Sequence, residues 1–146
     1  MLFKLIIDRE KEESVVVTAH EPSALTEELQ ALVAGTERRD ELTGYTEEDT
    51  VILKIGRIEC ICVEDGRTFA IYEDGVRYRL RGRLYEVEAR LGSEFVRINK
   101  SALANWNRIR RFKASIAGAV DVEFKSGHVE YVSRRCFAEL KRRFDL

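Results

Sequence analysis

Short β-prone runs separated by turn dipeptides fill residues 51–132, and this pattern limits the fold more than any other feature of the chain. Asp65-Gly66 and Asp74-Gly75 each lie between two runs rich in valine, isoleucine, phenylalanine and tyrosine, and Ser126-Gly127 lies between a third pair. Such dipeptides supply the positive φ angles that tight hairpin turns require. We therefore predict a mainly β fold of antiparallel hairpins with short helices, in the α+β class.

Three segments have the apolar spacing of amphipathic helices, with hydrophobic side chains recurring at intervals of three and four residues. They are residues 22–34, 83–91 and 134–144. Gly35 follows the first segment, where a helix commonly ends. Ser133 precedes the last segment and is placed to cap it. We expect a short helix in each.

The first part of the chain is organised differently from the rest. LFKLIID (residues 2–8) and SVVVTA (residues 14–19) are β-prone runs joined by a charged stretch, which predicts a small hairpin before the first helix. Residues 36–49 have no apolar period and are predicted to be a linker or surface loop. The sequence thus suggests an N-terminal hairpin and helix at 1–45 and a second domain at 46–146.

The chemical composition narrows the class of protein. The 146 residues are 45% hydrophobic and 35% charged, which is typical of a folded chain rather than a disordered one. We expect no membrane span, because no apolar run approaches roughly 18 residues. The N-terminus also lacks the features of a secretion signal, so we expect a cytoplasmic protein.

Three cysteines and two histidines are too few for the common cysteine-based frameworks. Cys60 and Cys62 lie two apart within an apolar run, which favours reduced, buried thiols over a disulfide. A lone Cys-x-Cys is a weak signal for a structural zinc site, which needs four ligands. We therefore expect neither a metal nor a cofactor.

Charge is distributed unevenly along the chain. Residues 1–50 carry a net charge of −8, residues 51–96 are balanced, and residues 97–146 carry +7. A basic C-terminal third favours a polyanionic partner. The alternative is that these cations are simply solvated surface residues.

The sequence motifs of common enzymes are missing. The chain has no G-x-S-x-G element, no Walker A loop, no H-E-x-x-H motif and no glycine-rich dinucleotide loop. The two histidines are far apart in the sequence, and acidic runs such as 47–49 are typical of solvated faces. We expect no enzyme activity and no small-molecule substrate.

Three groups in the C-terminal half combine cations with side chains of fixed hydrogen-bonding geometry. They are Arg97, Asn99, Lys100 and Ser101; Lys125 and Ser126; and Arg134 and Arg135. Arginine and lysine can read guanine, asparagine can read adenine, and serine can hold a phosphate. Each group falls on a loop or at the end of an element, so the three could converge on one DNA-binding face.

Two longer runs contain these groups: FVRINKSALANWNRIRRF, residues 95–112, and EFKSGHVEYVSRRCFAELKRRF, residues 123–144. With their RINKS and VSRR elements, they resemble the signature half of the LytTR DNA-binding domain family, and the resemblance extends over about residues 50–145. It implies a fold of small antiparallel sheets whose loops enter successive major grooves. The N-terminal part resembles the extension of small stand-alone regulators that lack a receiver domain.

The resemblance also assigns roles to individual positions. The family's first base-reading position falls on Asn99, the hairpin contact falls near Lys125 and Ser126, and the third falls on Arg134 or Arg135. Many relatives have histidine at the position of Asn99, so the base preferred there is open. Many also have an aromatic residue at the position of Cys60, a change expected to affect packing only.

Two functional hypotheses follow. The first is a sequence-specific transcriptional regulator that binds direct repeats in double-stranded promoter DNA as a homodimer, with residues 1–45 serving dimerisation or regulation. A small membrane protein is a further regulatory partner that the resemblance implies. The second is a protein-interaction adaptor whose basic face binds an acidic protein or a membrane-associated partner. Preference for one duplex over scrambled DNA distinguishes the two.

Overall fold

The computed structural model describes residues 2–36, 40–114 and 118–146. The chain divides into two compact units, residues 1–38 and residues 39–146. Across the described residues, no helix is both long enough and apolar enough to cross a membrane.

The N-terminal unit contains one helix, α1 (Ala24–Thr36), within two residues of the predicted bounds. The helix begins where it does because Ser23 acts as its cap. The Thr26 backbone N–H donates to the Ser23 hydroxyl at 3.3 Å, and the Ser23 N–H donates to the Thr26 hydroxyl at 2.8 Å. This reciprocal pair satisfies backbone donors that the first turn of a helix leaves free.

The hairpin predicted before α1 does not form as paired strands. The chain turns at residues 9–11, where the Glu10 N–H donates to the Asp8 carboxylate at 3.1 Å, but no strand is assigned in residues 2–23. The apolar side chains of the two runs are exposed, as Ile7 illustrates at 83%. An isolated two-stranded ribbon is marginal in water because nothing packs on its apolar face. The local β propensity is therefore not sufficient here.

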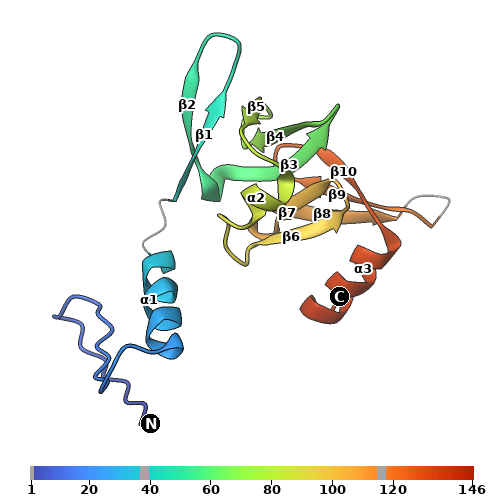
Figure 1. Ribbon diagram of the computed structural model, residues 1–146. Coiled ribbons are helices and arrows are strands. Elements are labelled where there is room, and N and C mark those ends of the chain that lie inside the picture. The colour runs from blue at the N-terminus through green and yellow to red at the C-terminus, as the bar shows by residue number, and fades with distance from the viewer. Residues whose placement is uncertain (1, 37–39, 115–117) are drawn as a thin grey trace. The chain divides into compact units, whose positions relative to one another are not determined.

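The second unit is built from two antiparallel sheets (Figure 1). The larger has the order β2-β1-β5-β4-β3-β7-β6 and the smaller the order β10-β9-β8. The strands are β1 (Glu41–Tyr45), β2 (Thr50–Lys54), β3 (Ile58–Glu64), β4 (Arg67–Tyr72), β5 (Arg77–Leu80), β6 (Phe95–Asn99), β7 (Ala102–Asn105), β8 (Ile109–Ala114), β9 (Val120–Phe124) and β10 (Val129–Val132). The helices are α2 (Leu84–Glu88) and α3 (Arg134–Phe144), with 3-10 turns η1 (Ile55–Arg57) and η2 (Trp106–Arg108). The predicted fold class is confirmed.

The three predicted turn dipeptides join the strands that they were expected to join. Asp65 and Gly66 have φ angles of 49° and 73° between β3 and β4, the pair of positive angles that a type I′ turn requires. Gly75 and Gly127, between β4 and β5 and between β9 and β10, have φ angles of 81° and 95°. Local turn chemistry therefore fixes these connections.

One segment predicted to be a loop or linker contains a strand. β1 lies within residues 36–49 and pairs with β2, and it begins ahead of the domain boundary suggested after residue 45. Its alternation is hard to see in the sequence because the inward positions are Leu42 and Gly44. A Cβ atom on Gly44 would lie 2.7 Å from Cδ1 of Leu53 and 2.8 Å from Cβ of Tyr78. Long-range packing defines this strand.

β3 is buried on both of its faces. Ile58 and Ile61 belong to the core cluster that includes α2, whereas Cys60 and Cys62 belong to the cluster that includes Phe124 of the smaller sheet. The register shift between Ile58 and Cys60 marks a bulge. A strand covered on both faces has a nearly continuous apolar sequence, which explains the run IECICV. β3 therefore joins the two cores.

α3 closes the smaller core. The Ser133 hydroxyl accepts from the Cys136 N–H at 3.2 Å, which confirms the predicted cap. Leu140 is buried, and the ring of Phe144 stacks on Trp106 with centroids 3.6 Å apart. These contacts fix the position of the helix and hence of the arginines at its start.

We expect Gly44→Ala to destabilise the second unit by about 1–3 kcal/mol, because the added methyl group would overpack the contact with Leu53 and Tyr78. Gly56→Ala is the matched control, since a Cβ there meets no atom within 4 Å. Urea denaturation of both variants measures the difference. Equal stability of the two variants would show that the close approach at β1 is easily relaxed.

Candidate nucleic-acid interface

The β6–β7 turn is held by side chains that bond to its backbone. The Asn99 Oδ1 atom accepts from the Ser101 N–H at 2.7 Å, and Arg97 Nη1 donates to the Lys100 carbonyl at 3.0 Å. Arg97 is itself fixed by an ion pair of 2.8 Å with Glu88. These bonds leave the Lys100 side chain exposed at the tip of a turn with a defined backbone.

The start of α3 lies beside this turn. The Asn99 Nδ2 atom donates to the Tyr131 carbonyl at 2.7 Å, and the Ser133 N–H donates to the Ile98 carbonyl at 2.8 Å. Arg134 and Arg135 follow immediately and are exposed. Two of the three groups that the sequence singled out are therefore brought together.

The third group lies at the other end of β10. The residues from His128 to Ser133 separate the β9–β10 turn from α3 by roughly 16 Å, at about 3.3 Å per residue. Lys125 is exposed in this turn, and its carbonyl accepts from Arg110 Nη2 at 3.2 Å. Arg110 is an exposed cation that the sequence analysis did not select. The structure thus places two basic sites, one at each end of β10.

The β9–β10 turn is anchored to a buried carboxylate. Glu59 is fully buried in the bulge of β3, and it accepts from the Ser126 hydroxyl and from the Ser126 N–H at 3.2 Å. Arg108 lies 3.6 Å from Glu59 and 3.5 Å from Glu73. A buried charge is tolerated only when it is paired and hydrogen bonded. The sequence signal for this network is the single acidic residue within the apolar run IECIC.

Two other cations in this half of the chain are already neutralised. Arg111 and Lys113 on β8 form ion pairs with Glu123 on β9. The hydrogen bond from Arg111, with a second from Lys113, holds the pKa of the Glu123 carboxyl below its usual value. These two cations are therefore less available to a phosphate than Lys100 or Lys125.

The predicted site residues fall into two classes. Arg97, Asn99 and Ser126 bind to other parts of the protein and define the turns, and Ser101 contributes through its backbone. Lys100, Lys125, Arg134 and Arg135 present exposed charges. The ion pair between Arg135 and Glu139 is long, at 3.8 Å, and the Arg135 side chain is 91% exposed. The sequence predicts that these residues lie at turns and at a helix start, as they do, but it could not separate the two classes, and their DNA contacts stay a prediction.

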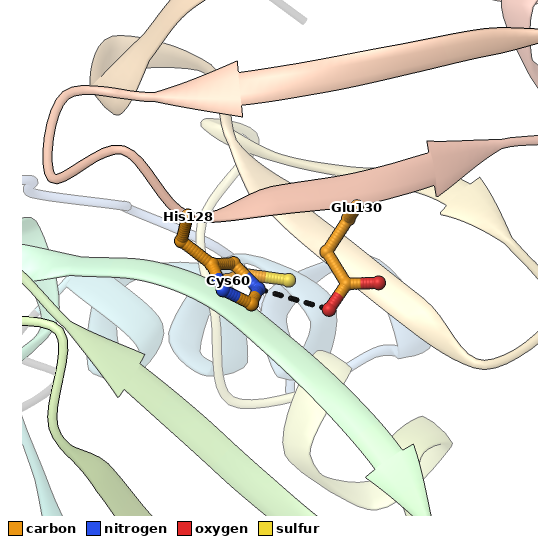
Figure 2. Close-up of side chains that lie close together, drawn as sticks. All are labelled: Cys60, His128 and Glu130. Atoms are coloured by element: carbon orange, nitrogen blue, oxygen red, sulfur yellow. Dashed lines mark hydrogen bonds and ion pairs between the residues drawn. The ribbon is translucent and has the colours of Figure 1, made fainter.

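Three potential metal ligands lie together next to the β9–β10 turn. The sulfur of Cys60, a ring nitrogen of His128 and a carboxylate oxygen of Glu130 all lie within 4.8 Å of one another (Figure 2). His128 Nε2 and Glu130 Oε1 are 2.9 Å apart. A hydrogen bond with Cys62, together with burial, raises the pKa of the Cys60 thiol well above its usual value, and the same bond lowers that of Cys62.

A mainly β domain that presents exposed cations on rigid turns and at a helix start has the features of a nucleic-acid-binding domain. The chain belongs to the LytTr DNA-binding domain family, whose profile matches residues 48–145. This is a family of DNA-binding domains and not of enzymes. The family expected from the sequence is confirmed, and DNA binding is the function of its domain.

Similar proteins support this assignment. Relatives named uncharacterized HTH-type transcriptional regulators occur in Staphylococcus aureus strains MSSA476 and NCTC 8325 / PS 47, each 26% identical over 149 residues and covering 100% of this chain and 99% of the relative. A solved LytTr DNA-binding domain from Bacillus cereus has the same fold, with a TM-score of 0.68 at 16% identity. That match covers 74% of this chain and 99% of the solved chain.

Ser126→Ala is expected to lower the free energy of unfolding by about 1–3 kcal/mol, because Glu59 is left buried without one of its donors. Lys125→Ala, in the same turn but exposed, serves as the control and should leave stability unchanged. Urea denaturation measures both. If Ser126→Ala were as stable as the control, the serine would not anchor the turn.

Proposed function

We propose that this protein is a sequence-specific transcriptional regulator that binds promoter DNA through the two basic sites at the ends of β10. One site comprises the β6–β7 turn and the start of α3, and the other is the β9–β10 turn. The observation that carries the proposal is that Lys100, Lys125, Arg134 and Arg135 are exposed on backbone segments fixed by buried or internal bonds. The names of the relatives as transcriptional regulators support it.

Rigid turns favour this function because binding then orders little of the protein. A side chain on a preformed turn loses less conformational freedom on binding than one on a mobile loop. The exposed ion pair of Arg135 with Glu139 is also weak enough to exchange for a base or a phosphate. The free protein therefore already holds its cations close to a binding arrangement.

Base reading at Asn99 uses hydrogen-bonding capacity that remains after the internal bonds are made. The Oδ1 atom accepts one bond of two, and the Nδ2 atom donates one bond of two. One acceptor site and one donor site remain, which is the pattern that adenine requires. We assign Asn99 both a structural and a reading role, with Arg134 or Arg135 beside it.

Loops, and not a recognition helix, are the reading elements in this proposal. Within the described residues, α2 and α3 are separated in sequence by five strands, β6 to β10, so they do not form a consecutive helix pair. The two basic sites contact neighbouring grooves, and bending of the duplex brings those grooves into reach. The energy of bending adds its own sequence preference.

The N-terminal unit is assigned to homodimerisation or to a regulatory contact, with a small membrane protein as the regulatory partner. Residues 1–38 contain four Lys/Arg and eight Asp/Glu, a net charge of −4, which disfavours contact with a phosphate backbone. Leu25 and Leu32, seven residues apart on α1, are exposed. The Staphylococcus aureus relatives match the chain over its full length, so they share this unit. We place the protein in the cytoplasm, where promoter DNA is found.

Selection of bound duplexes from a random library, at near-physiological salt, tests the function directly. Enrichment of one motif is expected, and two copies of the motif in the same orientation at a fixed spacing would indicate pairing on direct repeats. No enrichment by folded protein would contradict the proposal. The basic sites would then point to an acidic protein or a membrane-associated partner.

Single substitutions should separate base reading from phosphate binding. Arg135→Ala and Asn99→Ala are each expected to weaken binding to the selected duplex by about 1–3 kcal/mol relative to scrambled DNA. Lys100→Ala should weaken both duplexes equally and reduce the salt dependence. Fluorescence anisotropy titrations at several salt concentrations provide these values.

Arg142→Ala is the matched control for these variants, because it removes an exposed arginine from the last turns of α3. It should leave the preference for the selected duplex unchanged. Melting temperatures identify any loss of folding in Asn99→Ala. Equal losses on both duplexes for Arg135→Ala and Asn99→Ala would show that they contact phosphates only.

A further inference from the structure

We propose that Cys60, His128 and Glu130 form a binding site for a thiophilic divalent metal ion of the zinc class. The three ligand atoms lie within 4.8 Å of one another and come from different sheets, since Cys60 lies on β3 and Glu130 on β10. Figure 2 shows the sulfur and the carboxylate on the same side of the imidazole ring, with the ring nitrogen of His128 hydrogen bonded to the carboxylate. Residues distant in sequence thus converge at one point.

The ligand types select the class of metal. Zinc is bound by sulfur, imidazole nitrogen and carboxylate oxygen, whereas magnesium and calcium prefer oxygen alone. Ligand atoms in a tetrahedral zinc site lie about 3.3–3.8 Å apart, given bonds of about 2.0–2.3 Å. To reach this spacing, the 2.9 Å between His128 Nε2 and Glu130 Oε1 must widen slightly, whereas separations near the 4.8 Å limit must shorten. Three protein ligands leave the fourth position for water, as in other open zinc sites.

The strand geometry points these side chains the same way. His128 immediately precedes β10 and Glu130 is the second residue of that strand, and residues two apart in extended chain point to the same side. The ring of Phe124 stacks near His128, with centroids 5.9 Å apart and planes at 23°, which restricts the imidazole. An ion pair between His128 and Glu130 would explain why those two side chains lie together, but it does not involve Cys60. The buried thiol completes a set of three ligands.

Charge and access also suit a divalent ion. A thiolate and a carboxylate together carry two negative charges, which balance the ion in a largely buried site. On binding, the proton of the Cys60 thiol passes to solvent and the sulfur bonds to the metal. Cys60 is fully buried, but the His128 and Glu130 side chains are 24% and 20% exposed, so an ion can enter from their side.

Metal binding would act on the β9–β10 turn, a consequence that rests on the function proposed above. His128 lies two residues after Ser126, which is already anchored to β3 through Glu59. A metal ion bound by both His128 and Cys60 adds a second link between the β9–β10 turn and β3. The ion would therefore hold Lys125 in place for DNA, and its removal would weaken binding at that turn.

Cobalt(II) is the probe for the site, added to the reduced full-length protein without DNA. We expect one equivalent to give the thiolate-to-cobalt charge-transfer band and the intense visible bands of a tetrahedral site, and Zn²⁺ to displace it. Cys60→Ser should abolish the charge-transfer band, and Glu130→Gln should weaken cobalt binding at least tenfold. Cys136→Ser, which removes a cysteine on α3, is the matched control and should retain the full spectrum.

Absence of the charge-transfer band in the wild-type protein, or its persistence in Cys60→Ser, would overturn the proposed metal site. Because Glu130 is partly exposed, Glu130→Gln tests the proposal even if Cys60→Ser folds poorly. DNA affinity is measured separately, with and without Zn²⁺. A cobalt site in a protein that selects no duplex would overturn only the proposed DNA function. Selective DNA binding without a cobalt site would overturn only the metal.

Discussion

Burial of β3 on both faces is the constraint from which the rest of the domain follows. Ile58 and Ile61 face the core beneath α2, while Cys60 and Cys62 face the smaller sheet. Such a strand has no solvent-exposed side for polar side chains, so the bulge at Glu59 is the place where a charge enters the interior. Because that charge must be paired, the bulge requires partners, and the partners it finds are a turn of the smaller sheet and an arginine of η2.

The candidate interface combines interior and surface roles in neighbouring residues. Asn99 and Ser126 bond inward and determine the shape of two turns, while the adjacent Lys100 and Lys125 extend outward with free charges. Affinity for a polyanion needs only the cations, whereas selectivity among polyanions needs their fixed placement. Stability and recognition are therefore linked. A substitution at an inward-facing residue changes the turn conformation that positions the outward-facing cations.

Local chemistry accounts for what could be predicted from the sequence. Turns with Asp-Gly or Ser-Gly and the cap at Ser133 depend on residues adjacent in the chain, so their patterns are sufficient. β1 escaped prediction because its burial is created by side chains from β2 and β5. The N-terminal runs have strand propensity, but within the described residues no other strand pairs with them. In the candidate site, the sequence predicts which residues lie at turns and at the start of a helix. The inward direction of Asn99 and Ser126 depends on Tyr131 and Glu59, which are distant in sequence.

The stacking of Trp106 on Phe144 has a practical consequence. The chain contains a single tryptophan, and its ring lies against the last turn of the helix whose first turn carries Arg134 and Arg135. The indole is half-buried, so its emission depends on how closely α3 is seated against η2. The molecule therefore carries an intrinsic optical reporter of this helix. Intrinsic fluorescence can follow the docking of α3 in the unlabelled protein, both during unfolding and when a ligand binds at the helix start.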